Sequence, residues 1–166
     1  MKVLVLICSI VLGFSLSVNC QKPVDKLEVQ IQDGPNTTVL SSTKLDPGCM
    51  LCSGSWDAAR KRYSGGMMFT HLDDYSSLSL DFDLPEGKVG TYTVAKGTDM
   101  PHLQVSGTGM FDISAISKEG TKITVTSLPT GAGTVTGSFD CNCQVYPWDK
   151  NLMKHIIGTF SFYKDK

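Results

Sequence analysis

Hydrophobic and polar residues alternate along much of this chain with a period of two, the spacing of a β-strand that buries one face. The clearest case is residues 78–84, where leucine or phenylalanine stands at every second position and serine or aspartate stands between. Residues 26–32 repeat the pattern with aliphatic residues at alternate positions. Both segments therefore predict strands with one face in a core.

Further segments rich in β-branched and aromatic residues extend this pattern, and we predict strands at 67–72, 90–95, 102–107, 110–116, 122–127, 133–139 and 156–163. Turn sequences containing glycine or proline, such as Pro85-Glu86-Gly87, separate them. Short strands spaced in this way are typical of sandwiches and barrels, and we predict an all-β fold, a single antiparallel β-sandwich of about 8–10 strands. Residues 56–63 fit either a helical turn or a strand with Trp56 facing inward.

The N-terminus has the pattern of an export signal. Met1 and Lys2 precede an apolar run over residues 3–16, which is short for a membrane span and typical of a signal-peptide core. No later segment has an apolar run long enough to predict a transmembrane helix. We predict a signal peptide at 1–20, cleaved at or near Cys20, a short tether at 21–25 and one domain at 26–166.

Two routes of signal removal are open. Ser15-Leu16-Ser17 and Val18-Asn19-Cys20 both offer the small-x-small pattern of an ordinary signal peptidase. Cys20 also stands where a bacterial lipoprotein carries its acylated cysteine, although Asn19 is unusual directly before it. We therefore expect either an outer-membrane or cell-envelope lipoprotein, held at the membrane by lipid on Cys20, or a freely secreted extracellular protein.

Charge and composition narrow the function. The chain has 15 basic and 16 acidic residues, a net charge of −1, and loss of Lys2 with the signal leaves 14 against 16, or −2. A nucleic-acid-binding protein normally shows a basic excess, so we expect no nucleic-acid partner. A hydrophobic content of 41% is sufficient for a packed core.

The six cysteines divide by location. Cys8 lies in the signal and Cys20 is the candidate lipidation site, which leaves two pairs, Cys49/Cys52 and Cys141/Cys143. Exported proteins meet oxidising conditions, so two disulfides are expected. We favour cross-links between the two pairs, because bridging the 88-residue gap from Cys52 to Cys141 would stabilise the fold by about 4–5 kcal/mol. Closure of Cys141 onto Cys143 spans one residue and is generally strained.

A structural zinc site is the alternative for the same four cysteines. Residues 48–54 have the C-x-x-C-x-G form of a zinc knuckle, whereas Cys141 and Cys143 are separated by one residue instead of two. Four protein ligands would leave no open coordination position, so such a zinc would be structural. We predict no catalytic metal and no other cofactor.

The other candidate residues give weaker indications of a binding or catalytic site. Tyr146 and Trp148 flank Pro147 and could form a stacking platform for a sugar, or pack over the end of the sandwich. The sequence also contains carboxylates, histidines and one basic cluster. The group His71-Leu72-Asp73-Asp74 could bind a cation, but we interpret it and the others as solvated surface: Asp81, Asp83, His102, His155 and Arg60-Lys61-Arg62. No nucleophile elbow, zinc-protease motif, phosphate loop or dinucleotide fingerprint occurs.

Several short motifs resemble a known group of proteins: Trp56-Asp57-Ala58, Tyr63-Ser64-Gly65-Gly66, Ser77-Leu78-Ser79-Leu80, Gly90-Thr91-Tyr92-Thr93-Val94, Ile123-Thr124-Val125-Thr126-Ser127, residues 133–139 and Gly158-Thr159-Phe160-Ser161-Phe162. With these the chain resembles small exported lipoproteins of Bacteroidota that begin at a lipidated cysteine and end in a Gly-Thr-Phe-Ser-Phe-like strand. The resemblance covers roughly residues 50–166. It implies a β-sandwich and an envelope location but no catalytic residues, and the cysteines after Cys20 depart from it.

These observations predict a non-catalytic envelope or secreted protein, a lipid-anchored binding domain with an unidentified protein or glycan partner. The alternatives are a secreted hydrolase, which requires two titratable groups in one cleft, a glycan-binding module with loops at one end of the sandwich, and a purely structural lipoprotein.

Overall fold

The computed structural model describes residues 25–44, 49–70, 76–98, 100–147 and 150–164. These residues form eleven antiparallel strands and one short 3-10 helix: β1 (Lys26–Asp33), β2 (Asn36–Ser41), η1 (Ser42–Lys44), β3 (Cys49–Asp57), β4 (Arg62–Thr70), β5 (Ser77–Leu84), β6 (Gly90–Thr93), β7 (His102–Thr108), β8 (Ile113–Ser117), β9 (Lys122–Ser127), β10 (Gly133–Val145) and β11 (Leu152–Lys164). The all-β prediction is confirmed. The predicted signal peptide at 1–20, with Cys20, lies outside the described residues.

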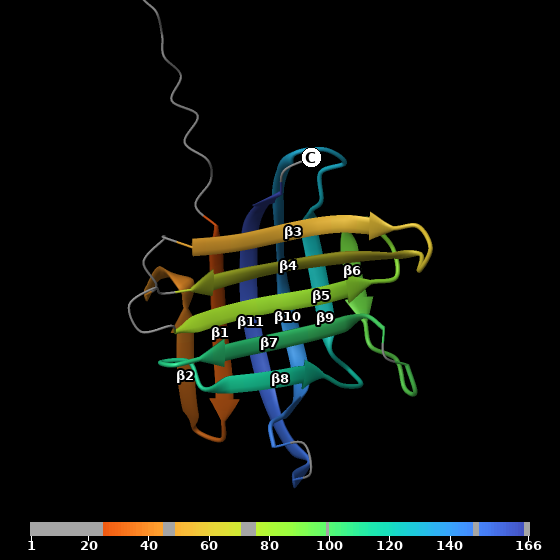
Figure 1. Ribbon diagram of the computed structural model, residues 1–166. Helices are drawn as coiled ribbons and strands as arrows, with labels where there is room; N and C mark the ends of the chain where they lie inside the picture. Colours follow the sequence, from red (N-terminus) through yellow and green to blue (C-terminus); the bar gives the residue numbers. More distant parts are fainter. Residues whose placement is uncertain (1–24, 45–48, 71–75, 99, 148–149, 165–166) are drawn as a thin grey trace, which may run out of the picture.

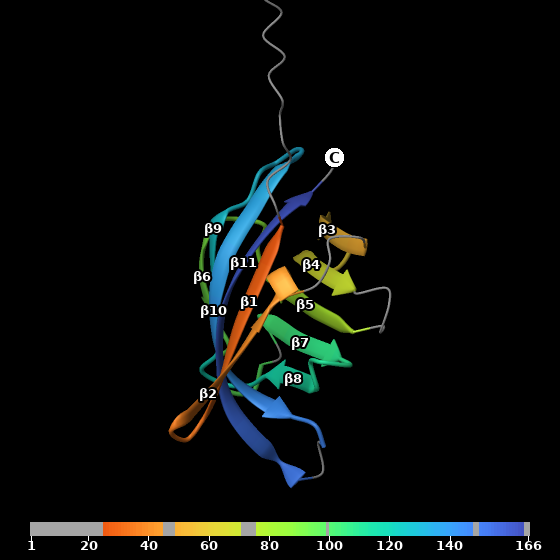
Figure 2. The same ribbon diagram turned by 90° about the vertical axis from the view of Figure 1, so that its left-hand side faces the viewer.

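All eleven strands belong to one sheet that curls into a half-barrel. The main path runs β2-β1-β11-β10-β8-β7-β5-β4-β3, and β9 also pairs with β10 and carries β6 on its other edge. Strands β3, β4, β5, β7 and β8 form one layer, which crosses the layer of β1, β11, β10 and β9 (Figures 1 and 2). The two layers are thus parts of a single continuous sheet.

The long strand β10 joins the two layers. Its first half pairs with β9 through residues 136–140, and its last residues, Cys143–Val145, pair with β8. Because β10 is 13 residues long and sheets twist progressively, one strand can belong to both layers. The sequence pattern predicted only residues 133–139 of it.

Apolar side chains from alternate positions of the strands fill the space between the layers. In β5, Leu78, Leu80, Phe82 and Leu84 are all buried, as the pattern predicts. The Phe82 ring lies between the layers with its centroid 5.1 Å from that of Phe160 on β11. Aromatic rings at such separations pack in favourable tilted arrangements. This contact therefore helps to hold the layer that contains β5 against the layer that contains β11.

Glycine and phenylalanine lie directly opposite each other at three places on the inner face. The pairs are Gly65 with Phe82, Gly137 with Phe160 and Gly158 with Phe139. A β-carbon on any of these glycines would overlap the ring of its partner. The glycines therefore let the rings lie across the neighbouring strand, which explains the recurring glycine within otherwise β-branched segments.

The chain enters the domain at Asp25 beside the end of β11. The Asp25 carboxylate accepts a hydrogen bond from the backbone N–H of Tyr163 at 2.5 Å, and the backbone N–H of Leu27 donates to Ser42 Oγ at 2.9 Å. These bonds attach the first strand at its start. Within the described residues, no helix has the length and apolar character needed to cross a bilayer.

Candidate functional site

A groove of about 490 Å³ lies at one end of the half-barrel, in the surface of the described residues. It lies where β3, the last strand of the sheet, comes beside the end of β11 without pairing to it. The strand ends contribute Trp56, Tyr63 and Lys164, and the remaining lining comes from the β5–β6 and β9–β10 loops, residues 86–88 and 128–130. Incomplete closure of the sheet therefore creates the groove.

Trp56 and Tyr63 form the aromatic part of the groove. They are directly opposite each other on β3 and β4, and opposite residues of an antiparallel pair project from the same face. Trp56 is 49% exposed, whereas Tyr63 is only 3% exposed and its ring packs toward Phe82. The groove therefore has a buried tyrosine in its wall and an accessible indole at its rim.

The Tyr63 hydroxyl is buried without a hydrogen-bond partner among the described residues. It lies against Gly54, where a β-carbon would overlap it. Burial raises the pKa of Tyr63 to about 12, because the charged phenolate is poorly solvated there. The hydroxyl consequently stays protonated at physiological pH, and its unpaired state is a local departure from good packing.

Three charged side chains border the groove. Lys88 Nζ forms an ion pair with Glu86 at 3.2 Å. Lys164 Nζ lies 5.9 Å from the centroid of the Tyr63 ring, a cation–π geometry. The groove thus combines a flat aromatic surface, apolar contacts from Leu128 and Pro129, and charged groups at its rim.

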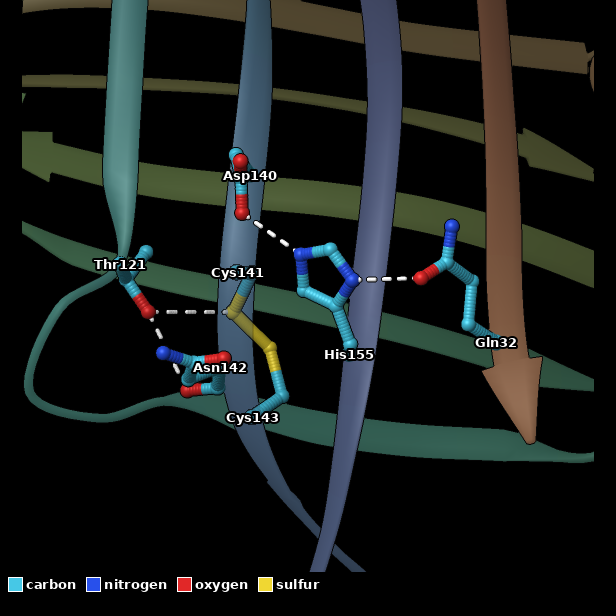
Figure 3. Close-up of polar contacts among 7 residues, drawn as sticks. All are labelled: Gln32, Thr121, Asp140, Cys141, Asn142, Cys143 and His155. Atoms are coloured by element: carbon cyan, nitrogen blue, oxygen red, sulfur yellow. Dashed lines mark hydrogen bonds and ion pairs between the residues drawn. A yellow bond between two sulfur atoms is a disulfide. The ribbon is translucent and has the colours of Figure 1, made fainter. Parts of the chain in front are cut away.

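The expected cross-links between the two cysteine pairs are wrong for Cys141 and Cys143, which form a disulfide with each other (Figure 3). Both residues lie on the buried face of β10, with Asn142 between them on the exposed face. Their Cα atoms are 5.5 Å apart, within the range that disulfides span. Alternation along one strand, not long-range closure, therefore brings these sulfurs together.

Cys52 lies on β3 and is a free thiol. It donates a hydrogen bond to Asp25 Oδ2 at 3.7 Å. Burial, followed by the charge of Asp25 and this hydrogen bond, raises the pKa of the Cys52 thiol to about 12. Cys52 is therefore a protonated thiol with little reactivity as a nucleophile or metal ligand.

The zinc alternative does not fit these positions. The Cys49–Asp57 backbone is a strand, whereas a zinc knuckle needs a turn between its cysteines, and disulfide sulfurs are not thiolate ligands. The part of the chain that the structure describes contains no group of three or more metal-binding side chains. The side chain of Cys49 lies outside the described residues.

Of the two residues of the predicted stacking platform, Tyr146 lies in the described part of the chain. Tyr146 follows the end of β10 and is 66% exposed, and its backbone N–H donates to the Ser114 carbonyl at 2.9 Å. Trp148 lies outside the described residues. Tyr146 is not among the residues that line the groove.

A second, smaller cleft of about 160 Å³ lies over β3, β4, β5 and β7. Sequence reasoning treated Asp81, Asp83 and His102 as separate surface groups, but the register places Asp83 opposite His102. Burial and the charge of Asp83 raise the pKa of Asp81, while His102 lowers it. Ser64 Oγ donates to Asp83 at 2.6 Å, so this serine is not bonded to a histidine as an activated nucleophile would be.

His155 forms a separate polar network. It bridges Asp140 and Gln32 with two hydrogen bonds of 2.7 Å each, across β10, β11 and β1 (Figure 3). The basic cluster is also divided, because Arg60 pairs with Asp57 at 3.7 Å and Arg62 with Asp83 at 3.1 Å. His71, Asp73 and Asp74 lie outside the described residues. His155 and Arg62 thus make cross-strand surface contacts, and Arg60 pairs within the turn between β3 and β4.

Sequence reasoning missed the groove. It used Trp56 and Tyr63 only as parts of a predicted turn or strand and of the motifs that carry the resemblance, and it did not consider Lys164. An aromatic residue within the serine- and glycine-rich stretch 53–57 was the available signal. Comparison of the chain with protein-family models, with curated proteins and with solved structures found no match.

Proposed function

We propose that this protein is an exported, non-catalytic binding domain and that its ligand, a glycan, occupies the groove beside Trp56. The observation that carries the proposal is the half-exposed Trp56 side chain at the rim of a groove of about 490 Å³. Small-molecule sites typically have volumes of about 300–1,000 Å³ and combine aromatic walls with a few polar groups. The groove meets both criteria.

A glycan fits the chemistry of this lining. The C–H-bearing face of a pyranose packs on an exposed aromatic ring, while its hydroxyl groups need polar partners at the edge. Trp56 provides the ring, and Glu86, Lys88 and Thr130 provide polar groups. A purely apolar ligand would desolvate these polar groups without offering them any new polar contact, which is unfavourable.

The same lining supports binding over hydrolysis. Glycoside hydrolysis generally uses two carboxyl groups separated by about 5–9.5 Å. Among the described residues that line the groove, Glu86 is the one carboxylate, and it is paired with Lys88. We therefore favour the binding domain over the secreted hydrolase.

Export and a lipid anchor at Cys20 are part of the proposal. Asp25 bonds the Tyr163 backbone, and the next residue, Lys164, lines the groove. Cys20 is five residues before Asp25, and five residues span at most about 18 Å. An anchor at Cys20 would therefore hold the groove end of the domain toward the membrane.

The anchor is tested by the intact mass of the protein recovered from its host. We expect removal of residues 1–19 and added diacylglycerol and acyl groups on Cys20, and a Cys20→Ala variant that lacks this mass. A mature chain cleaved elsewhere and free of lipid would contradict the anchor. It would leave the groove proposal unaffected, because the groove is formed by residues 56–164.

Glycan binding is tested on an array of neutral and acidic oligosaccharides. The wild-type chain is compared with Trp56→Ala and with Tyr146→Ala, a matched removal of an exposed aromatic side chain outside the groove. We expect Trp56→Ala to lose binding and Tyr146→Ala to keep it. Loss on Tyr146→Ala alone would move the site to the predicted platform, and binding to no glycan would overturn the proposed function.

A further inference from the structure

We infer that the glycan is acidic, with a carboxylate on the sugar ring bound by Lys164. This inference depends on the proposed function, since it names the ligand class of the same groove. It starts from the distribution of charge among the residues that line the groove. The whole chain has a net charge of −1, so a positive groove is not a consequence of overall composition.

The two lysines of the groove differ in their partners. Lys88 is neutralised by Glu86 at 3.2 Å. Lys164 has no carboxylate partner among the described residues, and its ammonium group lies over the Tyr63 ring. Within the described part of the chain one positive charge of the groove is therefore left unneutralised, and an anionic ligand is the partner that complements it.

The position of Lys164 is held by packing. Its Cδ is 3.6 Å from the site that a β-carbon of Gly54 would occupy, and its Nζ is 5.9 Å from the Tyr63 ring centroid. The aliphatic part of Lys164 therefore lies within ordinary van der Waals reach of position 54 on β3. A charge held in place loses less conformational entropy when a ligand binds.

Tyr63 connects the cation with the stacking surface. It is opposite Trp56 in the strand pairing, and the Lys164 ammonium group lies over its ring. Opposite side chains of an antiparallel pair have β-carbons about 5 Å apart, which is close to the width of one sugar ring. A pyranose on Trp56 can therefore direct a ring carboxylate toward Lys164, as a uronic acid does.

The test compares trigalacturonate with its fully methyl-esterified, neutral form, using Trp56 fluorescence of the whole chain in a Trp148→Phe background to measure Kd. We expect the acid to bind more tightly than the ester by about fivefold, the effect of an ion pair worth about 1 kcal/mol. Added salt should weaken binding of the acid only. Lys164→Gln should abolish the difference between the two ligands.

Lys122→Gln is the matched control, because it removes the same charge from an exposed position on β9 outside the groove. It should keep the preference for the acid. Equal binding of acid and ester in the fluorescence assay, with both ligands lost by Trp56→Ala on the array, would overturn the acidic class while glycan binding stands. A preference that survives Lys164→Gln, or array binding confined to neutral glycans, would also overturn the inference. An array without any bound glycan would overturn the proposed function itself.

Discussion

Two regions of this protein use aromatic residues in cross-strand pairs, and they do so in opposite ways. In the core, Phe139 lies opposite Gly158, which has no side chain and leaves space for the ring. At the groove, Tyr63 lies opposite Trp56, and two large rings share one face of the strand pair. Phe139 is buried, whereas Trp56 stays half exposed and the Tyr63 hydroxyl has no partner among the described residues.

The difference shows where packing determines the structure and where it does not. In a purely structural region, apolar groups are buried and polar groups have partners. The groove departs from both rules, because it has an exposed aromatic ring beside a lysine without a carboxylate partner and a hydroxyl without a hydrogen bond among the described residues. Such departures are expected at binding sites, because a ligand supplies the missing contacts. Four measurements on the two regions test this contrast.

The largest effect is expected for Gly158→Ala. The new methyl group would overlap the Phe139 ring and the backbone carbonyl of Glu28, so the free energy of unfolding should fall by roughly 1–3 kcal/mol. Urea unfolding measures this change. Gly131→Ala is the control, since nothing lies within 4 Å of its added β-carbon, and equal stability of the two variants would contradict the glycine–phenylalanine interpretation.

Reduction of the Cys141–Cys143 disulfide should have an intermediate effect. The bridge closes a loop with one intervening residue, so the chain-entropy estimate is only about 1–2 kcal/mol. Urea unfolding with and without a reductant that reaches the buried bond gives the difference. A loss of 4 kcal/mol or more, about the value for a loop of nearly 90 residues, would indicate a long-range cross-link instead.

Tyr63→Phe should raise stability by about 1 kcal/mol, because it removes a buried hydroxyl without a partner. Its advantage should grow with pH. The folded-state pKa of Tyr63 is raised from 10.0 to about 12, so the folded state disfavours ionisation and the wild type loses stability as pH rises from 10 toward 12. The measurement is the free energy of unfolding of both proteins at several pH values in that range. The same pH dependence for both would contradict the burial of this hydroxyl.

Trp56→Ala should have the smallest effect on stability, within about 0.5 kcal/mol, because half of its side chain is already in water. Thermal unfolding of the variant checks this. A loss of 2 kcal/mol or more would place Trp56 in the core and remove the contrast between the regions. A small loss, together with lost glycan binding, would separate the role of Trp56 from folding.

The pattern of alternation predicted part of the sheet correctly. It identified β5, β9 and most of β1, β7 and β11, where apolar residues stand at every second position. It missed β2 and β3 and the first part of β4. Glycine stands at positions 54 and 65 of β3 and β4, and in β2 an exposed Val39 adjoins the buried Leu40, which weakens the contrast between buried and exposed faces. Its boundary for β10 was short because the buried residues there, Cys141 and Cys143, were interpreted only as cross-linking residues.

The cysteine prediction was wrong for a related reason. Sequence spacing favoured long-range cross-links because a two-residue separation was considered only as a strained local loop. Strand alternation places Cys141 and Cys143 on one face, and the position of Cys52 beside Asp25 on another strand depends on how the sheet curls. Spacing alone therefore could not determine the pairing.

The sequence by itself determined the all-β class of this protein and the inward face of its most regular strands, because side-chain direction in a strand follows from local alternation. Only the tertiary structure decided the curl of the single sheet, the short disulfide and the groove. Trp56, Tyr63 and Lys164 are brought together by the ends of β3, β4 and β11, residues that are up to 108 positions apart. Such contacts depend on strand order and twist, which a local pattern of residues does not encode.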